Sequence, residues 1–123
     1  MIRPIAKIAA LVAVCAAMAF PAAAQAPNSF SWSGDVDTSA TIFIHAHHAW
    51  VDNVVGKPVT NIDIDFNGEL PHDTDSTVHL HDVQGRGTVQ IIHQPTADNN
   101  YTAAVRISDP DPGRGHYHFV LDW

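Results

Sequence analysis

Period-two spacing of large apolar side chains is the feature that most restricts how this chain can fold. The last segment, residues 116–123, carries such a side chain at every second position: Tyr117, Phe119, Leu121 and Trp123. Side chains two positions apart lie on the same face of an extended strand, so this segment is expected to bury one face and expose the other. We predict a half-buried β-strand inside a sheet, with Trp123 in the core.

The same period recurs in seven further segments, namely residues 28–34, 40–45, 48–54, 60–66, 76–82, 87–93 and 101–107. No proline falls within them, whereas Pro58, Pro71 and Pro95 lie between them, as expected for strands whose backbone amides pair. No window has the apolar spacing of an amphipathic helix, so we predict no helices. The pattern favours an all-β fold, an antiparallel β-sandwich of about seven or eight strands, with a small flattened β-barrel as the alternative.

The alternation also predicts the inner face of each strand. The expected inward residues are Phe30, Trp32, Ile42, Ile44, Ala49, Val51, Ile62, Ile64, Phe66, Val78, Leu80, Val89, Ile91, Tyr101, Ala103, Val105 and Ile107. We expect a hairpin turn at Asn67-Gly68, because these residues readily adopt positive φ, and another around Ala46. Gly85-Arg86-Gly87 and Gly113-Arg114-Gly115 each open a strand, where the arginines either bind a small anion or keep the turn soluble.

Residues 1–24 have the organisation of a secretory signal peptide. Arg3 and Lys7 give a positive start, residues 8–20 form an apolar run, and residues 22–24 are the small alanines of a cleavage site. The apolar run is shorter than the roughly 20 residues that a membrane-spanning helix needs. We therefore predict cleavage at the end of this segment and a secreted or periplasmic protein.

The expected mature chain, residues 25–123, is a single all-β domain that is acidic and has no cysteine. Cys15 is the only cysteine and lies in the predicted signal peptide, so neither a disulfide nor a thiolate ligand is expected in the domain. The whole sequence holds 13 Asp and Glu against 6 Lys and Arg, for a net charge of −7, which argues against nucleic acid as a partner. We expect no membrane span in the mature chain, and an envelope protein or a glycan as the partner class.

Nine histidines are the most unusual part of the composition. Six of them form His-x-His pairs: His45 and His47, His79 and His81, and His116 and His118. Positions i and i+2 share a face of a strand, so each pair can offer two imidazoles to a Zn²⁺, Cu²⁺ or Ni²⁺ ion. His48, His72 or His93 could complete such a site. The alternatives are solvated surface histidines, which is the default, and a surface that gains charge as the pH falls through about 6.5.

A coherent catalytic set is missing from the sequence. Ser29, Ser31 and Ser33 have the spacing of an outward strand face and lack the turn that presents a serine nucleophile. Trp50 is expected on an outward face close to Phe43. An exposed aromatic pair would form a contact patch for a partner or a carbohydrate, unless a second layer of the protein covers it.

Three segments resemble small secreted bacterial proteins of unknown function. They are residues 30–37 (FSWSGDVD), 101–109 (YTAAVRISD) and 117–123 (YHFVLDW). The shared residues are core and turn positions, and the likeness extends over most of the expected mature chain. The resemblance implies a strand-rich fold and secretion, and it implies no activity.

These features predict a non-enzymatic, secreted or periplasmic β-sandwich module with a binding or structural role in the cell envelope. The alternative is a periplasmic protein that binds Zn²⁺, Cu²⁺ or Ni²⁺ through the His-x-His pairs. No other cofactor is expected.

Overall fold

The structure, a computed structural model, describes residues 28–52, 59–110 and 113–123. The predicted signal peptide, residues 1–24, lies outside these ranges, as do residues 53–54 at the end of one expected strand, so both stay predictions. No helix among the described residues is long and apolar enough to cross a membrane.

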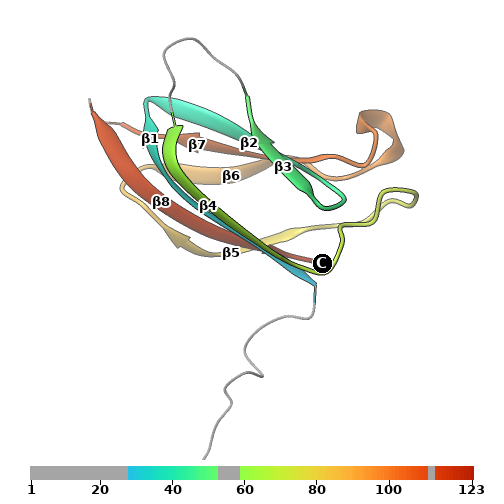
Figure 1. Cartoon of the computed structure of the whole chain (residues 1–123). Helices are drawn as coiled ribbons and strands as arrows, with labels where there is room; N and C mark the ends of the chain where they lie inside the picture. Colours follow the sequence, from blue (N-terminus) through green and yellow to red (C-terminus); the bar gives the residue numbers. More distant parts are fainter. Residues whose placement is uncertain (1–27, 53–58, 111–112) are drawn as a thin grey trace, which may run out of the picture.

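Two four-stranded antiparallel sheets pack face to face (Figure 1). Sheet A has the order β4-β1-β8-β5, formed by β4 (Val59–Asn67), β1 (Ser29–Asp37), β8 (Arg114–Asp122) and β5 (His79–Gln84). Sheet B has the order β3-β2-β7-β6, formed by β3 (His48–Val51), β2 (Ser39–His45), β7 (Ala103–Ser108) and β6 (Thr88–His93). The predicted antiparallel sandwich is confirmed, and the chain does not form the alternative closed barrel.

Several strand boundaries differ from the sequence prediction. Strand β1 continues to Asp37, whereas β5 begins only at His79. Before β5, the side chain of Gln94 replaces a strand partner: Val78 N donates to Gln94 Oε1 at 2.7 Å, and Gln94 Nε2 donates to Val78 O at 3.1 Å. Val78 is therefore buried as predicted, although it lies outside a strand.

The loop between β6 and β7 holds the one helical segment among the described residues, the short 3₁₀ turn η2 (Ala97–Asn99), which the sequence did not predict. Asn99 organises this loop by accepting hydrogen bonds from Thr96 N at 3.0 Å and Thr102 N at 3.2 Å. Tyr101 has φ of +56° and precedes β7, so the predicted strand start at this residue is wrong.

The connection after β4 is not the hairpin that the sequence predicted. Gly68 does have a positive φ of 102°, but β4 and β5 form the opposite edges of sheet A. The chain therefore crosses one end of the sandwich between these strands. The expected hairpin around Ala46 is confirmed, since β2 pairs with β3 and Ala46 has φ of +53°.

The core combines aromatic residues from sheet A with smaller aliphatic residues from sheet B. Phe30, Trp32, Tyr117 and Phe119 of sheet A are buried, as are Ile42, Ile44, Ala103, Val105 and Ile107 of sheet B. The rings of Trp32 and Phe119 stack with centroids 5.6 Å apart and an interplanar angle of 20°. Burial of each large apolar side chain contributes about 1.5–3 kcal/mol to the free energy of folding, so these rings dominate the core.

Two expected core residues are exposed, and several others, Trp123 among them, are only partly buried. Ile62 and Ile64 are 48% and 42% exposed, because β4 is an edge strand and the edge strand of the opposite sheet, β3, has only four residues. Trp123 lies after β8 and packs against the core while only partly buried. Its backbone N–H donates to Asn28 O at 3.2 Å.

The edge strands are short or irregular. β4 shifts register against β1 between Ser33 and Asp35, where Asn61 has φ of +56°. β5 shifts register against β8 after His81, where Asp82 has φ of +53°. β6 shifts register against β7 between Ile91 and His93, and β3 has only four residues.

Glycines of the two Gly-Arg-Gly segments make room for Tyr117, whose ring is fully buried. A Cβ at Gly85 would overlap the ring itself, and a Cβ at Gly87 would collide with Ser108 O and the Tyr117 hydroxyl. A Cβ at Gly115 would meet the Asp109 carboxylate. Close approach to Tyr117 and its neighbours therefore requires glycine at these positions.

We expect Gly87→Ala to lower the free energy of unfolding by about 3 kcal/mol, because the added carbon must displace a backbone carbonyl and a buried ring. The matched control is Gly113→Ala, since Gly113 has φ of +87° but nothing within 4 Å of an added Cβ. That variant should lose only about 1 kcal/mol, from backbone strain. Urea unfolding of both proteins measures the difference, and equal losses would contradict the packing argument.

Candidate functional site

The three predicted His-x-His pairs do not converge on one site. His45 and His47 lie at the turn between β2 and β3 in sheet B. His79 and His81 on β5, and His116 and His118 on β8, belong to neighbouring strands of sheet A. Within the described ranges, no group of three His, Cys, Asp or Glu side chains is arranged to hold a metal ion.

The pair on β5 shares one carboxylate. His79 Nδ1 lies 3.3 Å from Asp122 Oδ1, and His81 Nε2 lies 2.7 Å from Asp122 Oδ2. The His79 side chain is 68% exposed, and exposed ion pairs contribute little to stability because water screens them. These contacts form a polar outer face on sheet A.

Toward the other end of β8, His116 contacts Asp35 on β1, with Nδ1 2.9 Å from Oδ1. Asn61 Nδ2 donates to the other carboxylate oxygen at 2.8 Å. The hydrogen bond from Asn61, and after it the contact with His116, lower the pKa of Asp35 below its ordinary value. The Asp35 carboxylate is therefore ionised at neutral pH.

His118 lies opposite Ser33 of β1, and Ser33 lies opposite Asp63 of β4 on its other side. A Ser-His-Asp triad requires the imidazole between the hydroxyl and the carboxylate. In this row the hydroxyl stands in the middle, so the register does not place the three groups in catalytic order.

A shallow pocket of about 380 Å³ lies at the end of the sandwich where β5 turns into β6. Its polar centre is the ion pair of Arg86 and Asp109: Nε lies 3.0 and 3.1 Å from the two carboxylate oxygens, and Nη2 lies 2.9 Å from Oδ1. The Asp109 side chain is completely buried. Arg86 thus neutralises a buried carboxylate, which explains this arginine without a bound anion.

Beneath this ion pair lies the hydroxyl of Tyr117. The oxygen is buried and interacts with the Asp109 carboxylate and the Gly87 backbone, although neither contact has the geometry of a regular hydrogen bond. Burial, and after it the negative charge of Asp109, raise the pKa of Tyr117 above its ordinary value of 10.0. The hydroxyl group is therefore protonated throughout the physiological pH range, and Tyr117 belongs to the buried core.

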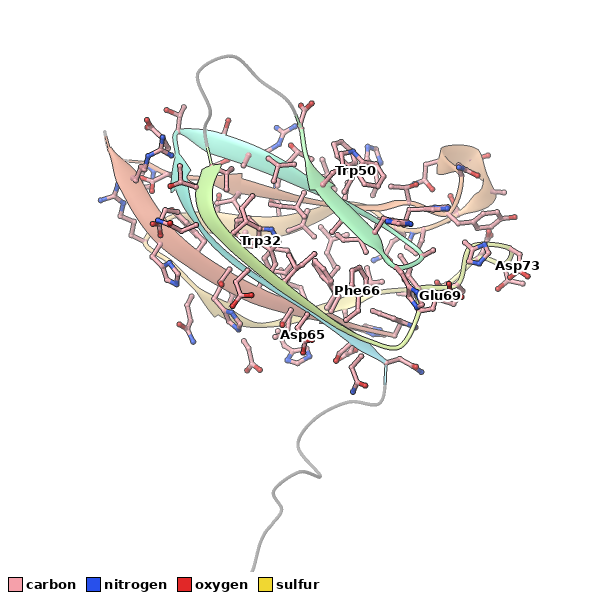
Figure 2. All side chains as sticks on the ribbon, viewed as in Figure 1. Trp32, Trp50, Asp65, Phe66, Glu69 and Asp73 are labelled. Atoms are coloured by element: carbon pink, nitrogen blue, oxygen red, sulfur yellow. The ribbon has the colours of Figure 1, made fainter. Side chains whose placement is uncertain are left out.

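The outer face of sheet B carries the exposed aromatic pair that the sequence predicted. Phe43 and Trp50 lie opposite each other on β2 and β3, with ring centroids 5.6 Å apart and an interplanar angle of 21°. Trp50 is 48% exposed on the outer side of sheet B, so about half of its side chain stays open to solvent (Figure 2). Ala49 and Val51 point the other way and pack against the core.

Small and polar residues continue this surface across the sheet. Ala104 of β7 lies opposite Phe43 and is 1% exposed. In the next row, Thr41 pairs with Arg106, and Arg106 Nε donates to Thr41 Oγ1 at 3.0 Å. We call these five residues, Thr41, Phe43, Trp50, Ala104 and Arg106, the aromatic face.

One cluster was not foreseen from the sequence as a unit. Glu69, in the loop after β4, lies between two imidazoles: its Oε2 is 3.8 Å from His47 Nε2, and its Oε1 is 3.6 Å from His72 Nε2. The i, i+3 spacing of Glu69 and His72 was a local signal. Their approach to His47 depends on how the loop crosses the end of the sandwich, which the sequence pattern does not contain.

No protein-family model matches the chain, and neither a curated protein nor a solved structure matches it significantly. The resemblance to small secreted bacterial proteins therefore stays a prediction.

We expect Tyr117→Phe to keep or raise the free energy of unfolding at neutral pH, by up to about 1 kcal/mol, because it removes a buried hydroxyl that makes no regular hydrogen bond. Folding raises the pKa of Tyr117, so the protonated side chain makes its full contribution to stability below the unfolded pKa of about 10. This contribution is lost as the pH rises through the pKa of the folded state. The variant should therefore lose less stability than the wild type above about pH 10.

Urea unfolding at neutral pH and at about pH 10.5 measures both effects. Tyr101→Phe, in the β6–β7 loop, is the matched control and should leave the alkaline loss in place. A clear loss of stability in Tyr117→Phe at neutral pH would show that the hydroxyl makes a hydrogen bond in solution.

Proposed function

We propose that this chain is a non-enzymatic, exported β-sandwich module that binds a carbohydrate of the cell envelope on its aromatic face. The observation that carries the proposal is the exposed, nearly parallel pair of Phe43 and Trp50 on the outer side of a sheet. A binding role needs only this rigid surface, and the strands on which it stands are fixed by the core beneath them.

Carbohydrate suits the chemistry of the aromatic face. A pyranose ring presents a flat set of C–H bonds, which carry partial positive charge, and the face of an aromatic ring is electronegative. Its hydroxyl groups need hydrogen-bonding partners at the edge of the contact. The exposed Arg106 supplies guanidinium donors in the row beside Phe43, and the buried Thr41 accepts the hydrogen bond that holds this arginine.

The exposed apolar area is too small to favour a protein partner. Trp50 is 48% exposed, and Phe43 is partly covered by it. Since a large aromatic side chain buries about 150–250 Å², the two rings together present on the order of 200 Å². A stable protein interface buries about 800 Å² on each partner. One or two sugar rings match the available surface better.

We expect the exported protein to bind β-1,4-linked N-acetylglucosamine tetramer or cellotetraose, and Trp50→Ala to weaken this binding at least tenfold, because the stacking surface is removed. Isothermal titration calorimetry measures the affinity. Ile62→Ala is the matched control, since Ile62 has the same 48% exposure but lies on β4 of the other sheet. It should leave binding unchanged.

Two outcomes would reject the carbohydrate assignment. One is the absence of saturable binding by either tetrasaccharide up to about 10 mM. The other is equal affinity in Trp50→Ala and the wild type while circular dichroism shows both to be folded.

A further inference from the structure

We propose that His45, His47, Glu69 and His72 form a binding site for Zn²⁺ at the end of the sandwich where the β2–β3 turn meets the loop after β4. This site is separate from the aromatic face and uses only one of the three His-x-His pairs. The turn supplies two of the imidazoles, and the loop supplies the third together with the carboxylate.

The backbone holds the two segments together. Leu70 N donates to Ala46 O at 3.3 Å, so the loop is joined to the turn by a hydrogen bond. The Leu70 side chain is completely buried and belongs to the core cluster, which anchors the loop. Figure 2 shows Glu69 at this end of the molecule, just past β4. The donor groups are therefore brought together by the fold and not by chance side-chain contacts.

Two pairs of donor atoms, each joining one imidazole to Glu69, stand near the separation that zinc imposes. Tetrahedral Zn²⁺ binds nitrogen and oxygen at about 2.0–2.2 Å, which places neighbouring ligand atoms about 3.3 Å apart. His72 Nε2 lies 3.6 Å from Glu69 Oε1, and His47 Nε2 lies 3.8 Å from Glu69 Oε2. Both distances lie within about half an ångström of the value for two ligands of one ion.

His45 provides the third imidazole. Its ring centroid lies 5.9 Å from that of His72, with an interplanar angle of 52°. Its Nδ1 is buried and has no hydrogen-bond partner within the described residues. A Zn²⁺ ion that takes the lone pair of Nδ1 would give this nitrogen the partner that it lacks among the described residues. Rotation of the ring would instead present Nε2 to the ion.

Binding requires side-chain rotation, because the described groups do not yet surround a single point. The side chains of His47, Glu69 and His72 are 61%, 47% and 49% exposed. Exposed side chains change rotamer on the picosecond to nanosecond timescale, so this adjustment is readily available. Three neutral imidazoles and one carboxylate form a donor set that zinc accepts.

The test is a Zn²⁺ titration by calorimetry on the exported, untagged protein after removal of metal by a chelator. We expect one ion per chain with a dissociation constant at or below about 1 μM. The double variant His47→Ala/His72→Ala should bind at least 100-fold more weakly while its melting temperature in metal-free buffer stays unchanged, because both side chains are exposed. Glu69→Gln should weaken binding at least tenfold, since it removes only the negative charge.

The matched control is His79→Ala/His81→Ala, which removes a His-x-His pair that contacts a carboxylate on the opposite sheet. This variant should bind Zn²⁺ as the wild type does. Affinity should also fall as the pH is lowered, because protons compete with the metal ion for the imidazole nitrogens.

Three results would overturn the proposal. They are unchanged affinity in His47→Ala/His72→Ala, an equal loss in the control pair, and several weak ions per chain in place of one. Trp50→Ala should leave the Zn²⁺ affinity intact, so failure of carbohydrate binding and failure of this site are distinguishable.

Discussion

The fit between an aromatic sheet and an aliphatic sheet is the contact on which this structure depends. The central strands of sheet A, β1 and β8, bring Phe30, Trp32, Tyr117 and Phe119 into the core. The central strands of sheet B, β2 and β7, meet them with isoleucine, valine and alanine. Facing sheets pack about 10 Å apart, which leaves room for large rings on one side only if the other side is smaller. Residues 28–52, 59–110 and 113–123 include no cysteine, so no disulfide among them compensates for a poor fit.

Strand periodicity made most of the fold predictable, because a period of two directly reports which side chains share a face. The eight strands, the β2–β3 hairpin and the outward position of Trp50 all follow from it. Pairing between distant strands does not, since many orders satisfy the same alternation. The Asn67-Gly68 turn shows this limit: its positive φ was predictable, but the strand that follows lies at the far edge of the sheet.

Edge positions explain the errors in the predicted core. Ile62 and Ile64 have the inward phase of a strand, yet burial also requires a neighbour across the sandwich, and β3 is too short to supply one. For the same reason, the candidate sites were only partly foreseen. The spacing of His45 and His47 was visible, whereas the approach of Glu69 depends on a loop whose course is fixed by burial of Leu70. Two four-strand units, β1–β4 and β5–β8, repeat one arrangement in which the fourth strand pairs with the first. The repeat cannot be recognised by comparing the sequences of the two units.

The irregular edge strands bear on how copies of this protein coexist. A regular, apolar edge strand offers unpaired N–H and C=O groups to a neighbouring molecule and invites aggregation. Here the exposed Ile62 stands directly beside Asn61, whose positive φ breaks the row of pairing groups on β4. Asp82 does the same on β5, and β3 is too short to extend a sheet. With the irregular β6, each edge strand that the structure describes is therefore a poor template for pairing with the sheets of another copy.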